Sequence, residues 1–435
     1  MTDQRHSPGP GFSGSLLRGM TSRRTSRRNM VKYMGMSVGA LSLSSILAAC
    51  GGDDGGPSGS GTSSGTSSMM PDYGAEPGTE LNFANWPLYI DKARKDGEVI
   101  YPSLEAFTEE TGISVNYEDV INDNANFVAT LIPQLQAGQD TGWDVIVVTN
   151  GREFETLKQN QWVYDLDPAL RPNFDANAAT WAKDPSFDPG NKIGMCWQSG
   201  LTGIGYRTDM IDGTIASLDD LMKPDLVGND MVGVLKAEIP DLAMNHLGID
   251  PPTSTPEDWQ EAANWITMLR DSGTVRQWYD QGYVEDLTAG NISVSTAWSG
   301  DVLYYQIWED YPFEFIVPDG GATLWVDEML IPVNAANPAG AYKMMDFYYQ
   351  PEIAQLVTEW VLYMSPVPAV QQLIAAHADA EKDAAYAEDL RLTAESTLLW
   401  PDDEMLSNVS FGRNLTTQEE RDEWDAIFLP VFEGV

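Results

Sequence analysis

Hydrophobic and polar positions follow two alternating periods from about residue 80 onward. Three short apolar runs predict strands, at residues 81–86, 113–120 and 144–148. Two amphipathic stretches between them predict helices, at residues 102–111 and 126–137. Gly112 and Gly138 follow these helices, and glycine is common just after a helix end. The order strand, helix, strand, helix, strand predicts a parallel sheet.

A second unit begins after the glycine-spaced segment GLTGIGY at residues 200–206. Apolar runs at 231–235 and 292–298 predict strands on either side of an amphipathic helix at 256–270. We expect this unit to form a second lobe. The chain then runs through residues 313–317 into 323–332, which we expect to return to the first lobe, so that two crossings in opposite directions form a hinge.

The returning stretch, TLWVDEMLIP at residues 323–332, carries candidate chemistry. In a strand, Trp325 and Asp327 lie on one face, whereas Leu324 and Val326 lie on the other. A ring beside a carboxylate suits an organic ammonium, because an aromatic face attracts a desolvated cation by about 0.5 to 2 kcal/mol. The alternative is a core tryptophan beside a surface aspartate.

Ligands of open parallel sheets bind beyond the carboxyl ends of the strands. The residues just after the first and third predicted strands are Trp86 with Tyr89, and Thr149 with Asn150. Trp298 ends the second predicted strand of the second unit. The alternative is that both tryptophans are core residues, but their positions at strand ends favour contact with a ligand.

Composition excludes several classes of function. The chain has 25 Lys and Arg against 65 Asp and Glu, a net charge of −40, which argues against a nucleic-acid partner. The charge does not identify a ligand, because acidity also keeps a secreted protein soluble. The chain lacks HExxH, CxxC and a phosphate-binding glycine loop, and its three histidines, His6, His246 and His377, lack ligand spacing. We therefore expect no catalytic residue, metal or cofactor.

The first 49 residues have the features of an export signal. Residues 26–32, SRRNMVK, resemble a twin-arginine motif, and residues 47–50, LAAC, resemble a lipobox that would place a lipid on Cys50. A transmembrane helix at residues 33–49 is a poorer interpretation, because this run is short and contains serine and glycine. We expect a flexible tether at residues 50–79. Cys196 is expected to be a buried thiol that forms no disulfide with Cys50.

Five ordered segments carry a resemblance to a known family. They are Asn85-Trp86 with Tyr89, WDVIVV at 143–148, TGIGY at 202–206, WSGD at 298–301, and WVD at 325–327 followed by LIP at 330–332. Over residues 81–373 the chain resembles the spermidine/putrescine-binding proteins of bacterial ATP-binding-cassette importers. The resemblance implies the two-lobed periplasmic binding protein fold of the type II kind, two α/β domains joined by a hinge. We expect residues 80–203 and 325–366 in lobe 1, and 204–324 and 367–435 in lobe 2.

The resemblance also implies roles for single residues. Trp86 and Tyr89 match aromatics that pack on the polyamine, and Trp298 matches the aromatic wall of the second lobe. Asp327 matches the carboxylate that holds an ammonium, with Trp325 beside it and Thr149 as the small hydroxyl residue. Glu238 is the candidate acid for the far ammonium. Asn150 is a further candidate ligand contact from its position at the third strand end, not from the resemblance.

Three features depart from the family pattern. Pro87 and Leu88 replace polar and acidic residues, Gly151 replaces a larger side chain, and Lys236 places a positive charge near Glu238.

The expected function is that of an exported monomer, anchored by lipid to the outer face of the cytoplasmic membrane. It would bind a polyamine and pass it to the permease subunits of an importer. One alternative is a binding protein for another organic cation or small solute. Another is a surface sensor or interaction lipoprotein on the same fold.

Overall fold

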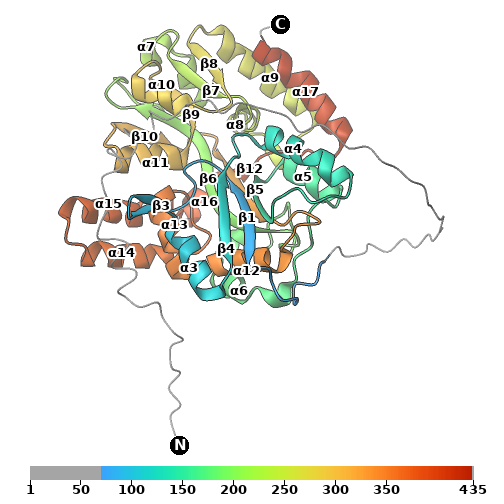
Figure 1. Ribbon diagram of the computed structural model, residues 1–435. Helices are drawn as coiled ribbons and strands as arrows, with labels where there is room; N and C mark the ends of the chain where they lie inside the picture. The colour runs from blue at the N-terminus through green and yellow to red at the C-terminus, as the bar shows by residue number, and fades with distance from the viewer. Residues whose placement is uncertain (1–69, 434–435) are drawn as a thin grey trace, which may run out of the picture. The chain divides into compact units, whose positions relative to one another are not determined.

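The computed structural model describes residues 70–433, whose centre is a ten-stranded mixed sheet surrounded by helices (Figure 1). Eight strands lie side by side in the order β4 (Ser114–Asp119), β1 (Glu80–Asn85), β5 (Val145–Thr149), β11 (Ala322–Leu330), β6 (Gly194–Arg207), β9 (Val294–Trp298), β7 (Val232–Leu235) and β8 (Val275–Tyr279). Two more strands join at the sides, β10 (Phe313–Ile316) beside β6 and β12 (Val409–Phe411) beside β11. A separate two-stranded ribbon consists of β2 (Ala93–Lys95) and β3 (Glu98–Ile100).

The first part of the sheet has the predicted alternation of strands and helices. Strands β4, β1 and β5 are parallel, and α3 (Pro102–Thr111) and α4 (Asn124–Gln136) connect them. Gly112 ends α3 in the left-handed conformation with φ 76°, which glycine adopts without steric cost. The predicted strands and helices of this part are confirmed to within two residues at each end.

The second part repeats this arrangement. Strand β7 is parallel to both β8 and β9. Helix α9 (Pro256–Asp271) begins at a capping box formed by Thr255 and Asp258, and it buries the predicted apolar face that includes Trp259. Helix α17 (Gln418–Glu433) packs against α9, with the rings of Trp424 and Trp259 5.2 Å apart.

The glycine-spaced segment lies within β6, a fourteen-residue strand that the sequence analysis did not predict. Strand β6 pairs antiparallel with β11 from Thr202 to Gly194, and its other end pairs antiparallel with β9 and β10. The parallel sheet predicted for the first unit is confirmed for β4, β1 and β5, whereas the strands that join the two parts, β6 and β11, are antiparallel to each other. Strands β6 and β11 are the two crossings between the parts, running in opposite directions as predicted.

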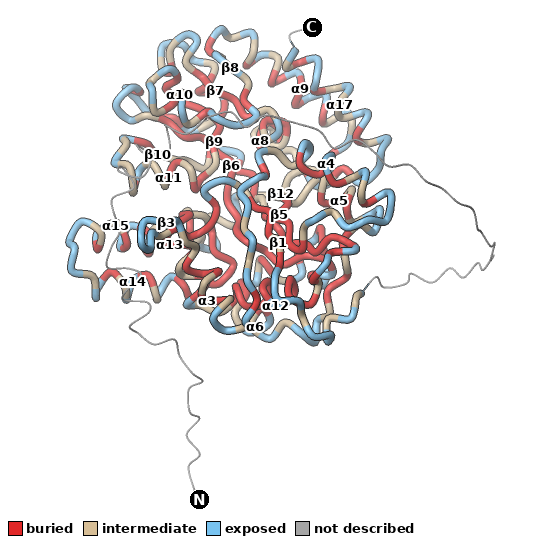
Figure 2. Tube along the Cα trace, in the orientation of Figure 1, coloured by how far each residue is buried: buried red, intermediate tan, exposed pale blue. Residues whose placement is uncertain are grey.

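Each part has its own hydrophobic core, and Figure 2 shows buried residues along the central strands. One core contains Ile146, Val148 and Leu131 together with Val326 of β11. The other contains residues of α8 (Ile239–His246), α9, β7 and α17. Two cores joined by crossing strands make this a two-lobed α/β fold.

Two residues before β1 contact the domain, in a segment that we expected to be a flexible tether. Tyr73 donates its hydroxyl hydrogen to the carbonyl of Asp165 at 3.0 Å, and its ring lies 4.5 Å from that of Tyr342. Gly78 donates to the side chain of Asn337 at 3.0 Å. The expected tether to residue 79 is therefore wrong at Tyr73 and Gly78, which contact the domain. The expected export signal and Cys50 lie outside the described residues, and no helix within 70–433 combines the length and apolarity needed to cross a membrane.

A group of helices after β11 touches both parts. Helix α12 (Pro338–Tyr348) is followed by α13 (Pro351–Val361), which contacts α3. Helix α14 (Val370–Ala380) contacts α13, whereas α15 (Ala384–Glu395) contacts α11 (Ser299–Trp308). The expected change of lobe between residues 366 and 367 falls between α13 and α14.

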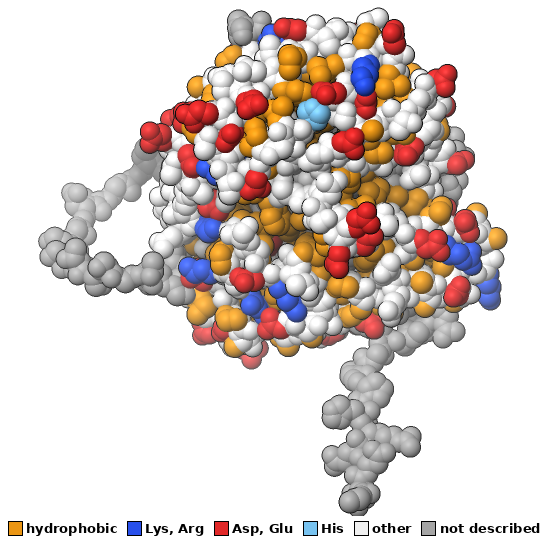
Figure 3. Space-filling view, turned by 180° about the vertical axis from the view of Figure 1, so that it is seen from behind, with side chains coloured by type: hydrophobic (Ala, Val, Ile, Leu, Met, Phe, Trp, Pro, Cys, Tyr) orange, Lys and Arg blue, Asp and Glu red, His pale blue; other side chains and the backbone are white. Residues whose placement is uncertain are grey.

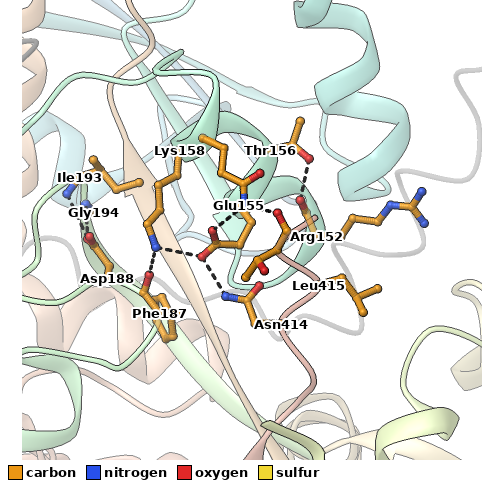
Figure 4. A network of polar contacts seen from close by, with 12 residues as sticks. Arg152, Glu155, Thr156, Lys158, Phe187, Asp188, Ile193, Gly194, Asn414 and Leu415 are labelled. Atoms are coloured by element: carbon orange, nitrogen blue, oxygen red, sulfur yellow. Dashed lines mark hydrogen bonds and ion pairs between the residues drawn. The ribbon is translucent and has the colours of Figure 1, made fainter. Parts of the chain in front are cut away.

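The segment that leads into α17 is tied to α5 (Arg152–Gln159) by the polar contacts in Figure 4. Asn414 donates from Nδ2 to Glu155 Oε1 at 2.8 Å, and Lys158 Nζ lies 2.9 Å from the same oxygen. Arg152 pairs with Asp425 of α17 at 3.0 Å. These contacts join a helix of the first lobe to the C-terminal helix of the second lobe.

We expect Glu155→Ala to lower the free energy of unfolding by about 1 to 3 kcal/mol, because Lys158 and Asn414 lose a buried acceptor. The Glu155 side chain is only 4% exposed, so water does not replace it freely. Urea denaturation measures the change. Glu388→Ala is the control, since the Glu388 side chain is 63% exposed and its ion pair with Arg391 should contribute less than about 1 kcal/mol. Equal losses in both variants would contradict the prediction.

Candidate functional site

Strand pairing places three of the predicted site residues together. Asp327 of β11 lies directly opposite Thr149, the last residue of β5. Strand β1 is the parallel neighbour of β5, and Tyr89 lies in the loop that follows β1. The rule that ligands gather at strand ends therefore selects residues that the fold brings into contact.

The carboxylate of Asp327 is held by two hydroxyl groups. Tyr89 donates to Oδ2 at 2.7 Å, and Thr149 donates to Oδ1 at 2.6 Å. Burial raises the pKa of Asp327 to about 6, and the two hydrogen bonds act against this shift. Within residues 70–433 Asp327 has no ion pair, so it is a buried acid with neutral donors only.

Thr149 and Asn150 have different roles. Thr149 Oγ1 also accepts from Asn124 Nδ2 at 2.9 Å, which orients its own hydrogen toward Asp327. Asn150 accepts from the backbone of Val326 at 2.7 Å, and its backbone donates to the Val326 carbonyl at 2.8 Å. The side-chain oxygen of Asn150 therefore holds β11 in place, which leaves its amide group for any ligand contact.

Trp325 lies on the same side of β11 as Asp327, as predicted. Its ring lies 5.4 Å from Tyr363, which in turn lies 5.4 Å from Tyr89. Leu324 and Val326 belong to hydrophobic clusters on the opposite side. Among the described residues, the indole nitrogens of Trp325 and Trp86 are buried without a hydrogen-bond partner. Trp86 also packs against the core of the first lobe, so part of its ring is a core contact, as in the alternative interpretation.

The second lobe supplies Trp298 and Glu238. Trp298 donates from Nε1 to Glu238 Oε1 at 3.3 Å. Burial raises the pKa of Glu238 to about 7. Lys236, the positive charge that departs from the family pattern near Glu238, forms an ion pair with Asp280 at 2.6 Å.

Three further residues complete the site, and sequence reasoning gave none of them a role. Asp301, in the first turn of α11, accepts from Tyr363 at 2.7 Å and from Tyr283 at 3.1 Å. Tyr283 also accepts from the backbone of Trp298 at 3.0 Å. Burial raises the pKa of Asp301 to about 6. Only Asp301 had a sequence signal, as the last residue of the segment WSGD.

These groups form a continuous series from one lobe to the other. The ring of Tyr363 contacts that of Tyr89, and Tyr89 donates a hydrogen bond to Asp327. Tyr363 also donates to Asp301, which accepts a second hydrogen bond from Tyr283. Figure 3 shows a recessed patch of hydrophobic side chains near the middle of one face, with both acidic and basic side chains around it. Three carboxyls among aromatic faces, one buried and two half-buried, suit a ligand with more than one positive charge.

Glu328, next to Asp327, was also missed. The register between β6 and β11 shifts between Asp327 and Glu328. Glu328 is 1% exposed, and neither carboxyl oxygen has a hydrogen-bond partner among the described residues. Burial raises its pKa well above the usual range, so we infer that it is neutral.

Residues 70–433 contain no group of three or more His, Cys, Asp or Glu side chains arranged to hold a metal ion. Cys196 is buried and free, and burial raises its pKa well above the usual value, as expected for an inert thiol.

Comparison with known proteins identifies relatives of the chain. It is 26% identical over 301 residues to the spermidine/putrescine-binding periplasmic protein of Escherichia coli K12, covering 69% of this chain and 81% of that protein. It is 29% identical over 312 residues to the putrescine-binding periplasmic protein SpuD of Pseudomonas aeruginosa, covering 68% of this chain and 80% of that protein.

A solved structure with the same fold is the spermidine/putrescine ABC transporter substrate-binding protein PotD of Streptococcus pneumoniae. It matches with a TM-score of 0.65 and 23% identity, covering 81% of this chain and 98% of that one. Residues 103–388 match the family model described as bacterial extracellular solute-binding protein. The family match and the relatives agree with the expectation of a binding protein rather than an enzyme. The chain belongs to the family of bacterial extracellular solute-binding proteins.

Proposed function

We propose that this protein captures a polyamine between its two lobes and delivers it to an ATP-binding-cassette importer. The observation that carries the proposal is a set of three carboxyls, the buried Asp327 and the half-buried Asp301 and Glu238, whose hydrogen-bond partners among the described residues are hydroxyl and indole groups. A buried carboxylate is costly unless a cation pairs with it. A ligand with several ammonium groups would supply those cations, and the names of the relatives point to the same class.

The aromatic rings suit the other part of such a ligand. The methylene chain between ammonium groups is apolar, and it gains by contact with ring faces. Trp325, Tyr363 and Tyr89 form a series of touching rings between two of the acids. This arrangement favours an elongated cation over a compact one such as a metal ion.

The ligand's identity within this class depends on the departures from the family pattern. Leu88 has a positive φ of 59° and is 56% exposed, so an apolar side chain is exposed where the resemblance implies a polar or acidic one. We therefore rank a diamine or a substituted amine beside the longer polyamines. A titration with putrescine, spermidine, spermine and arginine, followed by tryptophan fluorescence, separates these from another organic cation. Binding of none of them would favour the sensor or another solute.

We expect Asp327→Asn to weaken binding of the preferred polyamine by about 2 to 5 kcal/mol, which is roughly thirtyfold to several thousandfold. The substitution keeps the shape but removes the charge partner of the ammonium. Calorimetric titration measures the affinity, and the melting temperature without ligand shows that the variant folds. Asp379→Asn, at an exposed position of α14, is the control. Unchanged affinity in Asp327→Asn would place the ammonium elsewhere.

We also expect affinity to fall as the pH decreases. The pKa values of Asp327 and Asp301 are raised to about 6 and that of Glu238 to about 7, so these acids take up protons between pH 8 and pH 5. A bound ammonium requires the ionised form, while an aliphatic amine with a pKa near 10 keeps its charge throughout. The loss between pH 8 and pH 5 should be about tenfold or more.

Calorimetry at several pH values and in buffers of different ionisation enthalpy measures both the affinity and the protons released. Asp327→Asn should show a shallower dependence, because one titrating group is absent. The same affinity from pH 5 to pH 8 would mean that these carboxyls are not the ligand's charge partners.

We propose further that the protein is exported by the twin-arginine route and anchored by lipid on Cys50. The support is the sequence alone, SRRNMVK at residues 26–32 and LAAC at 47–50. Such an anchor would keep a monomer at the outer face of the cytoplasmic membrane, close to its permease subunits.

Cys50→Ala should abolish lipidation, so that the protein no longer enters the detergent phase on phase partition. Cys196→Ala is the matched control, because this thiol is buried and should not affect partition. Detergent partition that survives in Cys50→Ala would disprove the anchor.

A further inference from the structure

Two glycines lie directly against two rings of the site. Gly200 is opposite Trp325 in the β6–β11 pairing, and a Cβ atom on Gly200 would lie 2.4 Å from Cζ2 of that ring. Gly300, in the first turn of α11, would place a Cβ atom 2.5 Å from Cδ1 and Cε1 of Tyr363. Ordinary contacts of a Cβ atom begin at about 3.4 Å, so neither position has room for a methyl group.

Backbone conformation does not explain these glycines. Neither Gly200 nor Gly300 is among the residues with positive φ, so alanine could adopt both conformations without strain. Alanine is also the better helix former at Gly300. The close approach of a ring is the feature that requires glycine here.

The rings cannot move aside freely. Trp325 and Tyr363 contact each other with centroids 5.4 Å apart, so displacing one ring presses on the other. Met364, next to Tyr363, exchanges backbone hydrogen bonds with Ser199 of β6 at 2.8 and 3.0 Å, which fixes the chain behind the ring. A methyl group on Gly300 would therefore shift Tyr363 by about 1 Å, enough to disturb its hydrogen bond to Asp301.

We propose that Gly200 and Gly300 are positioning residues of the binding site, which set where the rings of Trp325 and Tyr363 lie relative to Asp327 and Asp301. Gly300 comes from the second lobe and Tyr363 adjoins the first, so this glycine also sets how closely α11 approaches the first lobe. The inference rests on the proposed function for its ligand. The ring positions themselves can be measured without one.

The main test is Gly300→Ala in the full chain, titrated with the polyamine that the parent binds most tightly. We expect affinity to fall about tenfold to a hundredfold, with the melting temperature without ligand lowered by no more than about 4 °C. The control is a double-mutant cycle with Tyr363→Ala. Because that variant removes the ring, Gly300→Ala should cause no further loss of affinity or stability in its background.

Gly200→Ala is the matched variant on the other ring. It should weaken binding to a similar extent, and it should have no further effect in a Trp325→Ala background. Together the two cycles separate a ring contact from a general defect in β6 or α11.

A measurement without ligand keeps the inference independent of the proposed function. Fluorotyrosine at position 363 should give a ¹⁹F resonance that shifts in Gly300→Ala and in Gly200→Ala. If the parent binds no amine but this shift and the stability cycle are found, the proposed function fails and the positioning role stands.

Three results would overturn the inference. Parental affinity in Gly300→Ala with an unshifted resonance would show that the ring has room. An equal loss in the Tyr363→Ala background would show that the methyl group clashes elsewhere. If Gly300→Ala does not fold, the double variant must fold, and its failure to do so would exclude the ring as the cause.

Discussion

The antiparallel pairing of β6 with β11 is the constraint on which the site depends. It places Trp325 opposite Gly200 and Asp327 opposite Gln198, and it continues past the site in both directions. A slip of one residue would turn Asp327 toward the core and Val326 toward the candidate site. The register shift after Asp327 leaves Trp197 of β6 without an opposite residue, and Trp197 donates to the carbonyl of Tyr89 at 3.1 Å. The same pairing thus fixes both Asp327 and the loop that carries its hydroxyl partner.

Electrostatics explains why the acids of the site are held by neutral groups. Each hydroxyl or indole donor offsets part of the desolvation of a buried carboxyl, and none supplies a full charge. An arginine or lysine partner would stabilise the empty protein more, but it would compete with a cationic ligand for the same oxygens. Lys236, the positive charge near Glu238 in the sequence, pairs with Asp280 instead of with Glu238. The acids therefore remain available, at the expense of raised pKa values.

The sequence predicted those parts of the fold that depend on local pattern. Strands β1, β4 and β5 and helices α3, α4 and α9 have the expected periods and ends, and Tyr89, Thr149 and Asp327 meet as the strand-end rule requires. Strand β6 was missed because its glycines remove the alternation that marks a strand. Gly200 has the ring of Trp325 against it, and Gly205 has the side chains of Val302 and Ala297 against it. Tyr283 and Tyr363 were missed for a related reason. Their roles come from contacts with Asp301, 18 and 62 residues away, which no local pattern encodes.

The partners of each acid indicate which part of the site depends on the two lobes being together. Asp327 is bonded by Tyr89 and Thr149, both of the first lobe, and Glu238 is bonded by Trp298, which belongs to the second lobe with it. Asp301 is different, because Tyr283 lies in its own lobe and Tyr363 follows α13, which packs on the first. Separation of the lobes would leave the first two acids with their partners and would remove one donor from Asp301. The Tyr363–Asp301 hydrogen bond therefore couples the position of the first lobe to the orientation of Asp301 in the second lobe.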